Sequence, residues 1–268
     1  MRILLGVIGL LLWPLWTVAG PLSWQGQLTQ GGLIVGQASP GVRLALDGQP
    51  IPLTPQGAFV FGFGREAPPQ ARLSVLFPDG QREDRLLNIA PRQYDVQYLD
   101  GLPPSKVNPP PALLERIRRE NAEVDEVRRQ DILQPYFLSG FAWPLKGRIS
   151  GVYGSQRILN GEPRQPHYGV DIAAPIGTPV RAPADGVVTL AEPDLYYSGA
   201  TLIIDHGYRL SSTLMHLNSI EVKVGQQVRK GDVVATVGKS GRVTGPHLDW
   251  RMNWRNDRID PTLTVPPQ

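Results

Sequence analysis

The sequence contains no cysteine. The chain therefore has neither a disulfide nor a thiol that could carry a lipid anchor, and its stability must come from packing and bound groups. Charged residues make up only 19% of the 268 residues, and the net charge is +3. Because Lys and Arg are spread along the chain, we expect no nucleic-acid partner and at most a mild attraction to an acidic polymer. Hydrophobic residues reach 41%, which excludes a disordered chain.

Long helical periodicity is also nearly absent. The 29 Gly and 27 Pro instead punctuate the chain into short segments, which predicts a mainly β protein with strands joined by turns. Between residues 20 and 100, Val42–Leu46 and Arg72–Leu76 alternate as half-buried strands do, and Asp47-Gly48 and Asp79-Gly80 are typical of hairpin turns. We expect this region to form a small β-sandwich.

Three aromatic residues in this region recur at every second position. Phe59, Phe61 and Phe63 would lie on one face of a strand. Such a face is either a platform on which a glycan stacks or the inner face of the sandwich. We favour the inner face, because alternating aromatics on a strand usually point inward.

The N-terminal apolar run is too short for a typical membrane span. Ile3 to Trp16 follows Arg2, is interrupted by Pro14 and is shorter than the about 20 residues that cross a bilayer. Small residues at Thr17-Val18-Ala19 are typical of signal-peptidase sites, so we expect a signal peptide over residues 1–19, cleaved after Ala19, and no stable membrane anchor thereafter.

Proline-rich sequence separates the two halves of the chain and fills residues 101–140 together with one helix. Leu102-Pro103-Pro104 and Pro109-Pro110-Pro111 predict a stiff extended spacer. The helix is expected from Ala112 to about Ile132, with Pro111 in its first turn. We interpret it as a surface helix packed on a domain; a regulatory helix that covers an active groove is the second interpretation.

The second half, residues 141–268, contains residues that can bind a metal. His167 and Asp171 are four residues apart, His216 stands alone, and His247 and Asp249 flank one leucine, so a strand would present both to the same face. Imidazole and carboxylate are ligands that zinc accepts, and a catalytic zinc site has three protein ligands and one open position.

The spacing of these residues and of the glycines and prolines between them resembles the LytM or lysostaphin-type zinc endopeptidases of bacterial cell walls. The resemblance covers roughly residues 141 to 265. It rests on these segments, in order: Trp143-Pro144, Gly147-Arg148, His167-x-x-x-Asp171, Ala173-Ala174-Pro175-x-Gly177-Thr178-Pro179-Val180, Ala184-Asp185-Gly186-Val187-Val188, Met215-His216-Leu217, Val224-Gly225-Gln226-x-Val228-x-x-Gly231 and Gly245-Pro246-His247-Leu248. It implies a C-terminal antiparallel β-sheet domain of the LytM type, the duplicated hybrid motif, with the metal on the floor of a groove.

The resemblance also implies roles for single residues. His167 and Asp171 would bind zinc, and His216 and His247 would handle the attacking water and stabilise the transition state. The family's third ligand is the second His of an H-x-H triplet, a position that Asp249 takes here. Two carboxylates would make the metal less positive than one, so we expect a higher pKa for its water, weaker catalysis and some tolerance of a harder ion such as manganese.

The implied function is hydrolysis of the peptide cross-links of peptidoglycan by a periplasmic zinc endopeptidase whose partners are the stem peptides. The alternative is a catalytically degenerate relative that binds the wall or activates a cell-wall amidase through a protein partner. Trp250, Arg251 and Trp254 are interpreted as packing and groove-edge residues. An exported carbohydrate-binding protein would explain the sandwich but not the second half.

Overall fold

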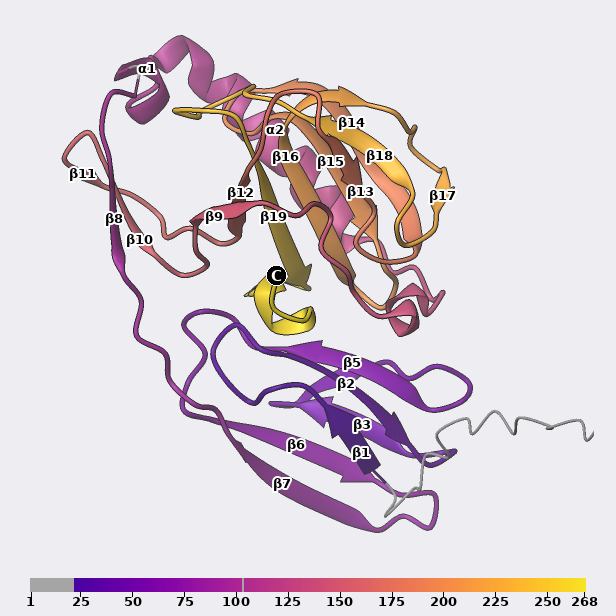
Figure 1. Ribbon diagram of the computed structural model, residues 1–268. Coiled ribbons are helices and arrows are strands. Elements are labelled where there is room, and N and C mark those ends of the chain that lie inside the picture. Colours follow the sequence, from indigo (N-terminus) through magenta and orange to yellow (C-terminus); the bar gives the residue numbers. More distant parts are fainter. Residues whose placement is uncertain (1–21, 103) are drawn as a thin grey trace, which may run out of the picture.

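The computed structural model describes residues 22–102 and 104–268 (Figure 1). The expected signal peptide lies outside the described residues. Strands dominate, and the larger sheets are antiparallel, so the expectation of a mainly β protein is confirmed. Within the described ranges no helix is both long enough and apolar enough to cross a membrane.

The N-terminal strands form two stacked sheets, seen at the bottom of Figure 1. The sheets have the strand orders β1-β2-β5 and β4-β3-β6-β7. The strands are β1 (Leu22–Gln25), β2 (Leu33–Ala38), β3 (Arg43–Leu46), β4 (Gln49–Ile51), β5 (Ala58–Gly62), β6 (Gln70–Leu76) and β7 (Arg82–Asn88). Asp47 and Gly48 connect β3 to β4 with φ angles of 48° and 80°, which is the backbone of the tight hairpin turn that the sequence predicts.

The aromatic residues of β5 lie inside this sandwich. Phe59 and Phe61 are fully buried, Phe63 is 5% exposed, and the rings of Phe59 and Phe61 are stacked with centroids 5.9 Å apart. These residues therefore stabilise the core, as the alternation predicts, and they are not accessible as a glycan platform.

The proline-rich connection is more structured than the sequence predicts. Residues 101–140 contain α1 (Pro104–Val107), α2 (Pro111–Arg129) and η1 (Tyr136–Ser139), and β8 (Val96–Leu99) directly precedes them, at the end of the region expected to form the sandwich. The expectation of an extended spacer is wrong for the turn of helix α1, and β8 pairs in parallel with a strand of the second half. Pro111 begins α2, as expected, because the first turn of a helix does not use its N–H groups within the helix.

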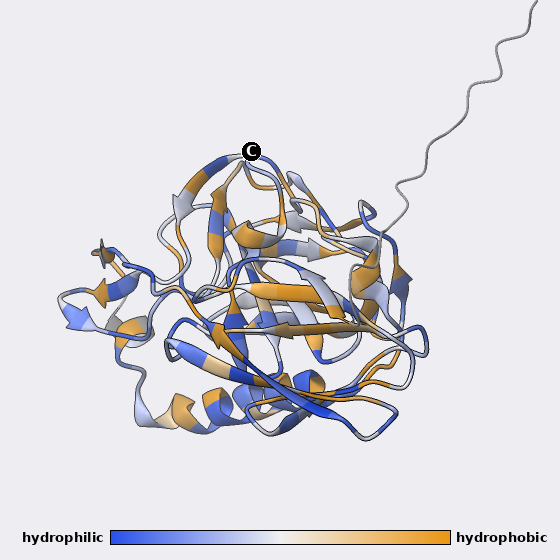
Figure 2. Ribbon diagram, turned by 90° about the horizontal axis from the view of Figure 1, so that it is seen from below, coloured by the Kyte–Doolittle hydropathy of each residue, from blue (hydrophilic) through white to orange (hydrophobic). Residues whose placement is uncertain are grey.

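Helix α2 is packed on the C-terminal sheet, behind β14 to β16 in Figure 1. Val124 and Val127 on the helix contact a small buried cluster of Leu190, Leu195 and Ile203. The long helix in Figure 2 carries hydrophilic as well as hydrophobic residues, as a helix with one face in solvent does. The interpretation as a packed surface helix is thus consistent with its contacts.

The second half is built on one large sheet. Its main path is β17-β14-β15-β16-β19-β12-β9, and β10 and β11 form a separate small sheet with β8. The elements are β9 (Arg148–Gly151), β10 (Gln156–Leu159), β11 (Glu162–Pro163), β12 (Val170–Ala173), β13 (Pro179–Arg181), β14 (Gly186–Leu195), β15 (Gly199–Asp205), β16 (Leu210–Ile220), β17 (Gln227–Val228), β18 (Val233–Val237), β19 (His247–Trp254), β20 (Asp257–Ile259) and η2 (Pro261–Thr264). Trp250 and Trp254 of β19 are buried, so the expectation that they are packing residues is consistent with their position.

The two halves contact each other near η2, which lies between them in Figure 1. Asp260 is 1% exposed, accepts a hydrogen bond from the Thr262 N–H and forms an ion pair of 2.8 Å with Arg92 from the loop after β7. The Tyr153 hydroxyl donates to the Arg258 carbonyl beside this pair. The Arg92–Asp260 ion pair therefore holds the sandwich against the end of the large sheet.

A buried carboxyl at the end of β15 supplies a pH prediction. Burial raises the pKa of Asp205 to about 7, against the partial compensation of a hydrogen bond from the Gly207 N–H. A carboxyl whose folded pKa is raised stabilises the fold below its unfolded pKa of about 3.9, and this contribution is lost as the pH rises through 7. The Asp205→Asn variant is therefore expected to be more stable than the parent at pH 7.5, on the order of 3 kcal/mol, with no advantage at pH 4. Urea unfolding of both proteins at the two pH values measures this, and an advantage independent of pH would contradict it.

Candidate active site

Three neighbouring strands carry the candidate site. Asp171 on β12 lies opposite Asp249 on β19, and Asp249 lies opposite Met215 on β16, directly before His216. The residues alternate across the sheet, so His247 and Asp249 share one face of β19 with Asp171 beside them. The fold thus brings together, from distant parts of the sequence, all five residues that the sequence analysis selects.

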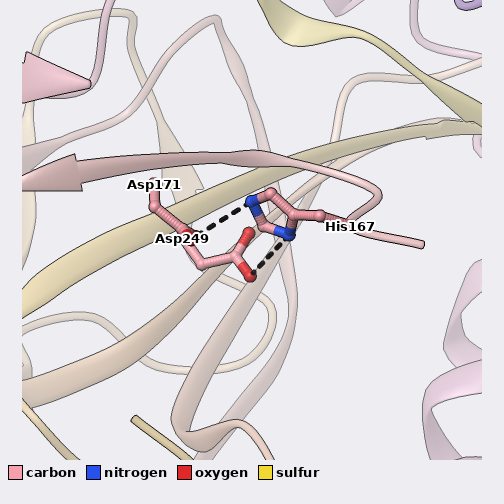
Figure 3. A group of neighbouring side chains, drawn as sticks. All are labelled: His167, Asp171 and Asp249. Atoms are coloured by element: carbon pink, nitrogen blue, oxygen red, sulfur yellow. Dashed lines mark ion pairs between the residues drawn. The ribbon is translucent and has the colours of Figure 1, made fainter. Parts of the chain in front are cut away.

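The predicted metal ligands form one buried group (Figure 3). His167 lies between the two carboxylates: its Nε2 is 3.1 Å from Asp171 Oδ1, and its Nδ1 is 3.9 Å from Asp249 Oδ2. One donor atom from each residue can be chosen so that all three lie within 4.8 Å of one another. His167 and Asp249 are fully buried and Asp171 is 6% exposed.

The two remaining histidines stand beside this group. The rings of His216 and His247 have centroids 4.9 Å apart, and His247 Nε2 is 3.7 Å from Asp171 Oδ1. Each ring has its Nδ1 2.9 Å from a backbone carbonyl, of Ser240 and Gly245 respectively. A carbonyl can only accept, so Nδ1 carries the proton in the neutral rings and each Nε2 has a free lone pair.

His216 occupies an irregular place in its strand. Ala200 is paired with Leu217 and Leu202 with Leu214, so Met215 and His216 together face a single residue of β15. This is a β-bulge, and His216 has a φ of 63°, a left-handed conformation that is unfavourable for histidine. The bulge directs His216 as well as Met215 toward the cavity beside the metal group.

Burial and charge determine the protonation of the site. Burial lowers the pKa of His216 to about 4, so its imidazole is neutral at neutral pH. Burial alone would raise the pKa of Asp171 and of Asp249. Contacts with His167 and Arg157 for Asp171, and with Arg251 for Asp249, nevertheless hold both pKa values below the usual range. Both carboxyls are therefore ionised near neutrality.

Two arginines hold the carboxylates. The sequence analysis interprets Arg251 as a packing or groove-edge residue and does not select Arg157. Arg157 Nη2 is 2.8 Å from Asp171 Oδ2, and Arg251 donates to both oxygens of Asp249, with Nη2 2.8 Å from Oδ2. Arg251 follows Asp249 by two positions, and residues two apart on a strand share one face, so the sequence alone could have indicated this contact. Arg157 comes from β10 in a different sheet, and nothing in its sequence position indicates the contact.

The donor set fits a divalent cation. Three buried atoms have no hydrogen-bond partner: Nδ1 and Nε2 of His167, and Oδ1 of Asp171. This holds although His167 Nε2 and Asp171 Oδ1 face each other. Buried polar atoms are almost always satisfied, so such a convergence of orphaned donors and acceptors indicates a bound ion. One imidazole and carboxylate oxygens are ligands typical of zinc.

A cavity of about 410 Å³ opens beside the metal group and reaches His216. One wall is the large sheet, through Thr213 and Met215 of β16, and the opposite wall is α2, through Asn121, Val124 and Arg128. Helix α2 therefore lies over the same face of the sheet as the metal group.

These features define the class to which the second half belongs: an antiparallel β domain with a buried histidine and carboxylate centre at the end of a groove. Comparison with known proteins identifies it further. The family model of peptidase family M23 matches residues 165–261. The region that resembles LytM-type peptidases in sequence is thus matched, over residues 165–261, by peptidase family M23.

Relatives and a solved structure support this assignment. The chain is 41% identical over 108 residues to the peptidoglycan DD-endopeptidase ShyA of Vibrio cholerae, covering 40% of this chain and 25% of that protein. It is 38% identical over 131 residues to an uncharacterized metalloprotease of Haemophilus influenzae, covering 47% of this chain and 27% of the relative. The chain thus spans about a quarter of the length of these curated relatives. The crystal structure of a putative M23 peptidase from Pseudomonas aeruginosa matches with a TM-score of 0.68 and 28% identity, over 89% of this chain and 95% of that one.

Proposed function

We propose that this protein is a zinc-dependent endopeptidase that hydrolyses the peptide cross-links of peptidoglycan in the periplasm. The observation that carries the proposal is the buried group of His167, Asp171 and Asp249, whose orphaned atoms converge beside two histidines with free Nε2 lone pairs. The ShyA relative, a named peptidoglycan DD-endopeptidase, supports the choice of substrate.

In this proposal His167, Asp171 and Asp249 hold the zinc, which supplies a polarised water and a Lewis acid when bound. His216 and His247 act on protons. The free Nε2 of one ring would accept a proton from the attacking water and later pass it to the leaving amine. The other ring would take a proton from solvent at its own Nε2 and donate a hydrogen bond from it to the developing oxyanion. The Ser240 and Gly245 carbonyls hold a proton on Nδ1 of each ring, so Nε2 is the atom of each ring that takes up a further proton.

The two arginines change the expected effect of the second carboxylate. Asp171 and Asp249 contribute two negative charges, but Arg157 and Arg251 contribute two positive charges within ion-pair distance. The zinc dication would therefore enter a group of side chains with no net charge. The sequence-based expectation of a poorly polarised water counts only the carboxylates, and the arginines offset much of that loss.

A second candidate is a domain without catalysis that binds the wall or activates a cell-wall amidase through a protein partner. The same ion pairs favour it, because Arg157 and Arg251 balance the charges of the two carboxylates without any metal. The two candidates differ in what the site requires: a hydrolase needs the metal, and a docking surface does not.

The test uses the purified mature protein and cross-linked muropeptide dimers, with products separated by chromatography. We expect conversion of dimers to monomers that stops with a chelator and returns with zinc. The matched control is His216→Ala, which leaves the three ligands in place. Zinc-loaded protein that leaves the dimers intact while binding sacculi would reject the hydrolase and favour the docking function.

A further inference from the structure

The cavity between α2 and the large sheet is unusually rich in arginine. Its basic lining residues come from α2, from the segments around β10 and β11, from the loop after β18 and from β19 and β20. They are Arg128, Arg157, Arg164, Arg242, Arg251 and Arg258. His216 lines the same cavity, so the arginines surround a space that is continuous with the candidate metal centre.

Only part of this positive charge is neutralised by the protein. Arg157 and Arg251 pair with the two carboxylates of the metal group, and Arg164 pairs with Glu162 at 3.0 Å. In residues 22–102 and 104–268, neither Arg128 nor Arg258 forms an ion pair. The acidic residue that lines the cavity, Glu120, is already engaged by Arg116 and by the Tyr196 N–H.

Arg128 is the strongest indication of a missing ligand. Its Nη2 donates to Thr213 Oγ1 at 3.0 Å, but its Nε is buried and has no hydrogen-bond partner. Burial and the positive charges of Arg258 and Arg251 lower the pKa of Arg128 to about 9. Arg128 is half-buried, and a buried, unpaired Nε donor on a charged group is costly unless an anion compensates it.

Arg258 is the second positive group without a carboxylate. Its Nη1 donates to the Asn253 side-chain oxygen at 3.2 Å, and its guanidinium lies 5.8 Å from the centre of the Tyr168 ring. Burial and the charge of Arg251 lower the pKa of Arg258 as well. Asp125 acts on both arginines through space but forms no ion pair with either. Both therefore face, without a direct carboxylate partner, a cavity that has room for several non-hydrogen atoms of a ligand.

We propose that this arginine pocket binds free carboxylate groups of an acidic peptide and so positions that peptide at the metal centre. The inference rests on the proposed function and specifies its substrate: a peptide with two or more free carboxylates close to the bond to be cleaved. Arginine suits this task because its planar guanidinium donates two parallel hydrogen bonds to a carboxylate. Helix α2, which supplies Arg128, is then a wall of the substrate site and not an inhibitory cover.

The experiment measures equilibrium binding of two peptides to the full mature chain by calorimetry. One is Ala-Glu-Lys-Ala with a free terminal and a free side-chain carboxylate; the other is Ala-Gln-Lys-Ala with an amidated terminus. We expect the acidic peptide to bind at least about tenfold more tightly, and Arg128→Gln and Arg258→Gln each to remove most of this preference. Arg128→Lys, which keeps the charge, should retain part of it.

Two matched controls separate binding from folding. Arg119→Gln changes an exposed arginine of the same helix and should leave both affinities unchanged. Thr213→Val removes the hydrogen-bond partner of Arg128 without removing charge, so it reports any structural role of that contact. Thermal unfolding of every variant confirms that the fold is intact.

Equal affinity for the two peptides would overturn the proposal, as would a preference that survives both Arg128→Gln and Arg258→Gln. Inorganic phosphate that displaces the acidic peptide at equal concentration would also overturn it, because the pocket would then select any anion. The outcome is independent of hydrolysis. Carboxylate-dependent binding without cleavage of muropeptides would reject the proposed enzyme and leave the arginine pocket standing.

Discussion

Asp171→Ala protein is expected to contain less than about 0.1 metal ion per chain by mass spectrometry after purification with zinc, where the parent contains about one. Asp171 Oδ1 faces His167 Nε2 at 3.1 Å and has no hydrogen-bond partner, so it is the oxygen best placed to share an ion with that ring. Removing it leaves Arg157 without its carboxylate as well, which adds a positive charge where the cation should bind. Hydrolysis of muropeptide dimers should fall with the metal.

The third ligand is resolved by comparing Asp249→Ala with His247→Ala. We expect Asp249→Ala to lose the metal and His247→Ala to retain it while losing turnover. His216→Ala is the matched control that should hold about one ion, because His216 takes no part in the donor group. His247 Nε2 is nonetheless 3.7 Å from Asp171 Oδ1. The reverse result, with metal kept in Asp249→Ala and lost in His247→Ala, would make His247 the third ligand and Asp249 a carboxylate that orients His167.

The sequence predicts part of the arrangement of the candidate donors because that part is local. His167 and Asp171 stand one short segment apart, and His247 and Asp249 share a strand face, so spacing alone places each pair. The meeting of the two pairs needs the antiparallel register of β12 and β19, which the structure shows. The family resemblance implied only an antiparallel sheet and a metal shared by both pairs. The buried aromatics of β5 and the Asp47-Gly48 turn are likewise local, and they were predicted for the same reason.

The charged surroundings of the site were not predictable, because each depends on contacts between distant segments. Arg157 reaches Asp171 only because β10 is held by the parallel strand β8 from the connection between the halves. Arg128 enters the cavity only because α2 packs through Val124 and Val127 on the large sheet. Helical periodicity predicts that α2 has an apolar stripe, but it does not reveal which sheet the stripe covers.

Replacing His216 by Asn is expected to lower activity without lowering stability, whereas most substitutions lower stability. Turnover of muropeptide dimers should fall by about 10²- to 10⁴-fold, because the amide cannot accept the proton that a neutral imidazole accepts. The melting temperature should stay unchanged or rise. Position 216 has a φ of 63°, which asparagine adopts more readily than histidine, and an Asn side chain can still donate to the Ser240 carbonyl.

His247→Asn is the comparison that makes this result interpretable. Among the described residues, the positive φ angles of non-glycine residues include that of His216 and not that of His247, so asparagine relieves no strain at position 247. We therefore expect loss of turnover in both variants but a gain or retention of stability only in His216→Asn. Retained turnover in His216→Asn would place the proton acceptor elsewhere in the site. A clear loss of stability in His216→Asn would mean that the imidazole stabilises the bulge. The predicted result would mean that the fold tolerates a strained backbone at position 216 because the chemistry requires a histidine.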